Sequence, residues 1–191
     1  MRVVVISGKQ GSGKTTLSEG LGRHAEKAGL TVSRLKFADP LYEMHGEIHK
    51  VLLKHGEDFK TPDGKLLQLL GTEWGRSTLG HDVWARILMR RILKLDDMFQ
   101  DMRLVIVDDC RFRNELEAFR ILSASDNAKV LTVRLEAGEA LRRARAEKWR
   151  ENTTHPSEID LDGCAFDMTI NAEENAAAEV LEKVLAGLRT L

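Results

Sequence analysis

A glycine-rich loop near the N-terminus constrains the fold more than any other feature of this 191-residue sequence. Residues Gly8 to Thr15 read GKQGSGKT and fit the pattern G-x-x-x-x-G-K-[ST]. The β-branched run Val3–Ile6 precedes the loop, as expected for a buried strand of a parallel sheet, and a helix-like segment follows it. Glycines let such a loop curl so that its N–H groups point at phosphate oxygens. This context favours a nucleoside triphosphate site over a chance glycine-rich turn.

Two side chains of the loop carry the expected chemistry. Lys14 can reach the β- and γ-phosphates, and the Thr15 hydroxyl can ligate Mg²⁺. The loop therefore predicts triphosphate binding with Mg²⁺ and leaves the reaction open.

Strand-like and helix-like segments alternate along the chain, which predicts an α/β fold with a mainly parallel sheet. The expected strands cover Val3–Ile6, Thr31–Phe37, Leu104–Val107, Val130–Leu135 and Met168–Ile170. The expected helices include Thr15–Lys27, Arg113–Leu122, Glu139–Trp149 and Ala176–Leu188. The length and the absence of a linker rich in Pro, Gly or Ser predict one domain over residues 1–191. Within it we expect a helical insert at about 38–97 and a lid at about 137–163.

Composition excludes several classes of protein. Lys and Arg number 29 and Asp and Glu 30, so the formal charge is −1, which argues against a nucleic-acid wrapper or a cationic membrane-surface protein. Two cysteines, Cys110 and Cys164, make no disulfide framework and indicate a reducing compartment. No signal peptide or membrane-spanning run is apparent. The expectation is a cytoplasmic protein with no nucleic-acid or membrane partner.

An acidic pair, Asp108-Asp109, ends the buried run Leu104–Val107. A carboxylate at the end of a parallel strand can hold Mg²⁺ opposite phosphates bound to the loop. We expect one aspartate to approach the metal and the other to face an acceptor, although either could also cap the next helix. Arg111 follows at once and is suited to clamping phosphate, whereas Arg113 is left undecided.

A basic segment near the C-terminus is the expected lid. Its cations are Arg134, Arg142, Arg143, Arg145, Lys148 and Arg150. Arg142 and Arg145 are three residues apart and share a helix face. The alternatives are an ordinary solvated helix and a nucleic-acid patch. Phosphoryl transfer needs positive charge and exclusion of water, which favours the lid.

The helical insert is the only segment large enough for an acceptor pocket. Its candidate polar groups are Lys36, Lys65, Gln68, Thr72, Glu73 and Arg76. Trp74 and Trp84 are candidate faces for stacking a base. Core packing is an equal alternative for Trp84, because it lies on an amphipathic helix beside Val83 and Ile87. The histidines show no metal-ligand spacing with cysteine.

Taken together, these residues resemble a bacteriophage deoxynucleoside monophosphate kinase over essentially the whole chain. Beyond the glycine-rich loop, the resemblance rests on KFADPL at 36–41, LLQLLGTE at 66–73, DVW at 82–84, DCRFRNE at 109–115 and HPSE at 155–158. It implies ATP-dependent phosphorylation of a deoxynucleoside 5′-monophosphate with Mg²⁺. It also implies a five-stranded parallel sheet with an acceptor-binding insert and a lid. A homodimer, and the host cytoplasm for a phage-encoded chain, are expectations of the resemblance alone.

The resemblance also assigns residues. Carried over by motif, ATP would be held by Gly11, Ser12, Gly13, Lys14, Thr15 and Thr16. The acceptor would be met by Lys65, Gly71, Thr72, Trp84, Asp109, Arg111 and Glu115. This favours a functional role for Trp84 and puts Asp109 on the acceptor side, which leaves Asp108 for the metal. Lys65 and Gln10 depart from the arginine and the basic loop residue of some relatives, which affects selectivity rather than reaction type.

The expected reaction is in-line transfer of the γ-phosphoryl group of ATP to an acceptor phosphate oxygen. That oxygen is already anionic, so catalysis consists of positioning and charge neutralisation by Lys14, Mg²⁺, Arg111 and a lid arginine. One alternative is another small-molecule kinase with this loop, acting on a coenzyme precursor or a sugar acid. A second is a nucleotide-dependent switch protein, against which the chain lacks an N-K-x-D element.

Overall fold

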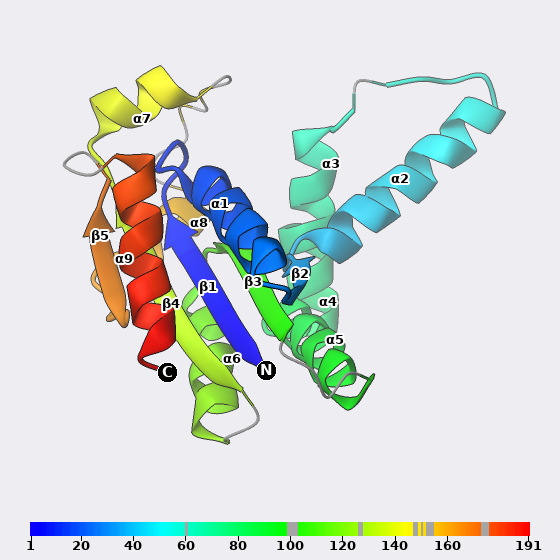
Figure 1. Cartoon of the computed structure of the whole chain (residues 1–191). Coiled ribbons are helices and arrows are strands. Elements are labelled where there is room, and N and C mark those ends of the chain that lie inside the picture. Colours follow the sequence, from blue (N-terminus) through cyan, green and yellow to red (C-terminus); the bar gives the residue numbers. More distant parts are fainter. Residues whose placement is uncertain are drawn as a thin grey trace.

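The centre of the molecule is a parallel sheet of five strands in the order β2-β3-β1-β4-β5 in a computed structural model (Figure 1). The structure describes residues 1–59, 61–98, 103–125, 128–146, 149, 151, 155–172 and 176–191. The strands are β1 (Arg2–Gly8), β2 (Thr31–Leu35), β3 (Arg103–Cys110), β4 (Lys129–Glu136) and β5 (Met168–Asn171). Every pairing is parallel, so all five strands end at the same edge.

Alternate residues of β1 point to opposite faces of the sheet, and helices cover both. Val4 and Ile6 pack against α1 (Lys14–Lys27) and α9 (Ala177–Arg189). Val3 and Val5 pack on the other face in a cluster with α5 (Val83–Met98) and α6 (Arg113–Ala124) (Figure 1). The side chains of residues 3–6, the β-branched run of β1, are fully buried. The β-branched run is therefore apolar without alternation because both its faces lie inside.

Helices fill the segment between β2 and β3. They are α2 (Asp39–Lys54), α3 (Gly64–Gln68), the π-helix η1 (Leu69–Arg76), α4 (Ser77–Leu79) and α5. Figure 1 shows α2 projecting away from the sheet, with α3 beside it. Asp63 begins α3 by accepting hydrogen bonds from the N–H groups of Lys65 and Leu66. No strand occurs here in the residues that the structure describes, which agrees with the expected helical character.

Two boundaries differ from the sequence-based expectation. β2 ends at Leu35 rather than Phe37, because the Phe37 N–H donates to the side chain of Asp109 in β3 instead of to a backbone carbonyl of that strand. The basic helix α7 (Glu139–Arg145) ends before Trp149, because the chain turns at Ala146 and brings the Trp149 ring against Arg142 and Arg143, at 5.4 and 5.0 Å. Residues 147 and 148 of the expected helix lie outside the described residues.

The short helix α8 (Pro156–Ile159) precedes β5. None of the helices that the structure describes combines the length and the apolar character needed to cross a membrane.

Candidate active site

The loop between β1 and α1 is packed so tightly that glycine is required at two of its positions. A Cβ on Gly8 would lie 2.4 Å from Ser12 Oγ and 2.7 Å from the Leu135 carbonyl oxygen. Gly11 has a φ of +76°, and a Cβ there would lie 2.3 Å from the Arg142 carbonyl oxygen. The loop is therefore wrapped between β4 and α7, with the N-terminus of α1 beneath it. This is the cradle that the motif predicts.

Lys14 folds back over its own loop. Its Nζ donates to the carbonyl oxygens of Gly8, at 2.7 Å, and Lys9, at 2.9 Å. Burial, followed by the charge of Arg111, lowers the pKa of Lys14 to about 8, while the carboxylates of Glu158 and Asp108 act in the opposite direction. An anion bound beside Lys14 would stabilise its charged form, which burial and Arg111 destabilise. The electrostatics of the site therefore favour phosphate binding.

The other loop residues fit a bound triphosphate as well. Thr15 and Thr16 are exposed at the start of α1, where their side chains can meet a ligand. Ser12 is buried, and its Oγ has no hydrogen-bond partner in the part of the chain that the structure describes. A buried hydroxyl without a partner is costly, so a ligand oxygen beside it would be stabilising. The residues present therefore fit the triphosphate that the motif predicts.

The two strand-end aspartates differ in their surroundings. Asp109 Oδ1 accepts from the Phe37 N–H and Oδ2 from the Ala38 N–H, both at 3.0 Å. Burial raises its pKa to about 6. Asp108 lies 3.6 Å from the Lys36 ammonium, and its side chain is 11% exposed. Asp109 thus fastens the start of the insert to β3, whereas the Asp108 carboxylate accepts no backbone hydrogen bond among those the structure records and is the better candidate for Mg²⁺ beside Thr15.

The Arg111 side chain is linked to the glycine-rich loop through the carboxylate of Glu158. Its guanidinium Nη1 is paired with Glu158 Oε1, and Glu158 Oε2 accepts from the Gln10 N–H at 3.0 Å. Glu158 belongs to α8 and was not among the predicted site residues, although the HPSE run that contains it was part of the resemblance. Only the contact across 47 residues of sequence reveals its place.

Glu115 lies in the interior of the structure, and its expected contact with the acceptor stays a prediction. Its side chain is 3% exposed, and Oε1 pairs with Arg76 Nη2 at 2.9 Å. Oε2 accepts from the N–H groups of Arg111, at 2.8 Å, and Phe112, at 3.1 Å. Burial raises the pKa of Glu115 to about 7. Glu115 therefore shapes the backbone that carries Arg111, and both of its oxygens are engaged by protein donors.

Trp84 also lies in the core, in line with the packing alternative. Its side chain is 4% exposed, and Nε1 donates to the Gly71 carbonyl oxygen at 2.8 Å. A Cβ on Gly75 would lie 2.3 Å from the Trp84 ring, and one on Gly71 would lie 3.0 Å from Leu41. For Trp84 to contact a base, or for Gly71 to contact the acceptor, the packing of Trp84 against η1 and of Leu41 against Gly71 would have to open. The Trp84 ring, on α5, thus packs against η1 at Gly71 and Gly75.

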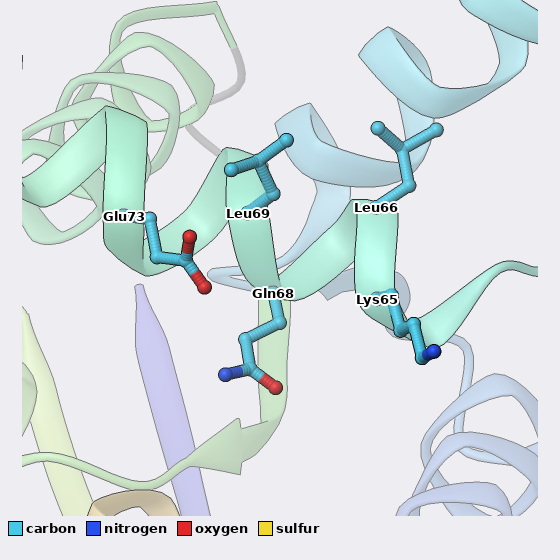
Figure 2. A pocket seen from close by; sticks show the side chains of 5 residues that line it. All are labelled: Lys65, Leu66, Gln68, Leu69 and Glu73. Carbon is cyan, nitrogen blue, oxygen red and sulfur yellow. The ribbon is translucent and has the colours of Figure 1, made fainter.

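Polar side chains of the insert gather at an open groove of about 370 Å³ on α3 and η1. Figure 2 shows Lys65, Gln68 and Glu73 extending in a similar direction and Leu66 and Leu69 extending in the opposite one; all five line the groove. The volume is in the range of small-molecule sites. Of the predicted acceptor residues, the structure thus brings Lys65 and Gln68 together, while Thr72 and Lys36 are exposed and are not among the residues that line the groove.

The two predicted arginines of α7 have different surroundings. Arg142 is 7% exposed and donates to the carbonyl oxygens of Ala137, at 2.9 Å, and Gln10, at 3.2 Å, so it holds α7 against the loop. Arg145 is exposed, donates to the Ala172 carbonyl oxygen at 3.2 Å, and lines a second cavity of about 160 Å³. That cavity is completed by Ser12, Gly13, Thr16, Leu17, Leu135, Ala172, Ala177 and Val180. Its apolar walls beside the loop suit the base of a donor nucleotide.

No protein-family model and no curated protein matches the chain. Solved structures do share its fold. The Mycobacterium tuberculosis APS kinase CysC in complex with AMPPNP and APS is 16% identical, with a TM-score of 0.61 over 98% of this chain and 97% of that one. A gluconokinase from Sinorhizobium meliloti 1021 is 17% identical, with a TM-score of 0.55 over 99% and 92%. The chain therefore has the α/β fold of P-loop kinases, and the expected fold class is confirmed.

Proposed function

We propose that the protein is a phosphotransferase that moves the γ-phosphoryl group of ATP to a small anionic acceptor. The observation that carries this is the convergence of Lys14, Arg111 and the Gln10 N–H at the glycine-rich loop, where the Glu158 carboxylate pairs with Arg111 and accepts from Gln10. An anion at this position is stabilised by both cations and by a backbone donor. That is the arrangement that stabilises a transferring phosphoryl group.

The donor side is assigned to the loop and the cavity beside it. The N–H groups of residues 11–16 would hold the phosphates, and Lys14 would neutralise the β- and γ-oxygens. Arg145 and the apolar walls of the 160 Å³ cavity would receive the base. Mg²⁺, with Thr15 and Asp108 as its protein partners, would neutralise phosphate charge and orient the donor.

The acceptor that we propose is a deoxynucleoside 5′-monophosphate, bound at the groove on α3 and η1. The Lys65 ammonium there can pair with an anion, and the amide of Gln68 and the carboxylate of Glu73 offer both donors and acceptors to a base edge. Leu66 and Leu69 add apolar surface for its ring. A phosphate acceptor needs no proton removed, which agrees with both oxygens of Asp109 being engaged by backbone N–H groups.

A second candidate is a kinase of the same fold that acts on another small molecule, such as a sugar acid or a coenzyme precursor. The similarity of the fold to an APS kinase and a gluconokinase favours it. The donor half would be unchanged, and the acceptor groove would take a different ligand.

The deciding experiment is an acceptor panel with MgATP, read by the phosphorylated product. Deoxynucleoside monophosphates are expected to yield diphosphates, whereas product from gluconate or a coenzyme precursor alone would favour the second candidate. Lys14→Ala should lower turnover by orders of magnitude with an unchanged circular dichroism spectrum. ATP consumption without any phosphorylated acceptor would contradict both and favour a nucleotide-dependent switch.

A further inference from the structure

The Glu158 carboxylate occupies the position where the loop and Arg111 converge. Oε2 accepts from the Gln10 N–H at 3.0 Å, and Oε1 is paired with the Arg111 guanidinium. The Glu158 side chain is 14% exposed and that of Arg111 34%. A backbone N–H of the loop and a guanidinium, presented to two oxygens of one anion, form the donor set that recognises a phosphoryl group.

The charge around Glu158 is also that of a phosphate site. The charges of Arg111 and Arg134 lower the pKa of Lys14, and that of Glu158 raises it. Glu158 therefore offsets a repulsion among three cations that a bound phosphate would also offset. A carboxylate carries one negative charge where a terminal phosphate carries up to two, so the phosphate is the stronger partner for the same donors.

The segment that carries Glu158 has other anchors. Asp162 pairs with Lys9, at 2.7 Å, and with Arg134, at 2.8 Å. Asp160 accepts from the Arg113 N–H at 2.7 Å. These contacts keep α8 beside the loop whether or not the Glu158 side chain stays in place. Its position on Gln10 and Arg111 is thus not needed to attach α8.

We propose that Glu158 stands in for a phosphoryl group in the ligand-free protein and that phosphate binding at the Gln10 N–H and Arg111 displaces it. This rests on the proposed function, because it names an anion subsite of the same site. The side chain then acts as an internal competitor: it keeps Arg111 in position while the site is empty and weakens the binding of every anion that must replace it. Removing its charge should tighten anion binding.

The test measures binding of inorganic tripolyphosphate by isothermal titration calorimetry to the wild type, Glu158→Gln and Glu117→Gln. Glutamine keeps the shape of Glu158 and removes the charge that pairs with Arg111. Glu117 is a matched control, since it pairs with Arg120 on the surface and is 57% exposed. We expect about tenfold tighter binding for Glu158→Gln, the size of a typical coupling between two ligands, and no change for the control. Equal or weaker binding by Glu158→Gln would overturn the proposal.

A wild-type measurement covers the case in which Glu158→Gln does not fold. Saturating tripolyphosphate should move the ¹³C resonance of the Glu158 side-chain carboxylate in NMR spectra toward that of a solvent-exposed glutamate, because its pairing with Arg111 and the Gln10 N–H is released. A Glu158 carboxylate resonance that stays in place at saturation would contradict displacement. If the wild type binds neither tripolyphosphate nor MgATP, the proposed function itself fails. If it binds both and Glu158→Gln is no tighter, only this inference fails.

Discussion

Arg76 and Glu115 form an ion pair in the interior, with 2.9 Å between Nη2 and Oε1 and with side chains that are 8% and 3% exposed. Arg76 comes from η1 of the insert, and Glu115 comes from the first turn of α6. Arg76 also stacks on Phe112 at 4.0 Å and donates to the His81 carbonyl oxygen. Because Glu115 accepts from the Arg111 N–H as well, this pair joins η1 to the segment that bears Arg111.

Arg76→Met should lower the free energy of unfolding by about 3–5 kcal/mol, because it leaves the Glu115 carboxylate buried without its partner. Arg120→Met is the matched control: Arg120 pairs with Glu117 on the surface, so its loss should cost under about 1 kcal/mol. Urea denaturation of the three proteins measures both. Similar losses for the two variants would show that the buried ion pair contributes no more to the free energy of unfolding than the surface pair does.

The free energy of unfolding should fall as the pH rises from about 4 to about 7. Burial raises the pKa of Glu115 from 4.5 to about 7 and that of Asp109 from 3.8 to about 6. The folded protein therefore binds more protons than the unfolded chain between about pH 4 and 7, and its free energy of unfolding decreases with pH across that window. Glu115→Gln should make this dependence shallower in denaturation series at several pH values. A slope unchanged by the substitution would refute the assignment to Glu115.

The adjacent aspartates should separate stability from activity. Asp109→Asn replaces one acceptor of a backbone N–H by an NH₂ group and should cost about 1–3 kcal/mol of stability. Asp108→Asn leaves those bonds in place, so it should change stability little and lower Mg²⁺-dependent turnover. Thermal unfolding and a Mg²⁺ titration of activity, run on both variants, give the comparison. The reverse pattern would exchange the two roles.

Trp84→Phe should destabilise the fold by about 1–3 kcal/mol, because it removes the hydrogen bond to Gly71 and leaves a gap against Gly75. Trp74 is 43% exposed, and Trp74→Phe should change stability by less than about 0.5 kcal/mol. Chemical denaturation compares the two. An unchanged stability for Trp84→Phe together with a raised KM for the acceptor would instead support the base contact that the resemblance implies.

Local sequence was enough for the sheet and the phosphate cradle. The run Val3–Ile6, the glycines that follow it and the start of α1 are adjacent in the chain, so their pattern reports their geometry directly. The strand Leu104–Val107 and its acidic end were equally visible, although β3 continues to Cys110. The β-branched runs are buried on both faces, which is why they stand out as apolar segments without alternation.

Tertiary structure alone decided which of the predicted site residues are buried and which side chains they contact. Trp84 and Glu115 have the residue types of a binding site, yet both are buried and bonded to groups many positions away. Glu158 lay in a polar stretch with no sign of its contact with Gln10 and Arg111. Residue type and spacing determine what a side chain can do, whereas long-range packing determines which partner it meets, because that partner is set by how the insert and α8 fold onto the strand ends.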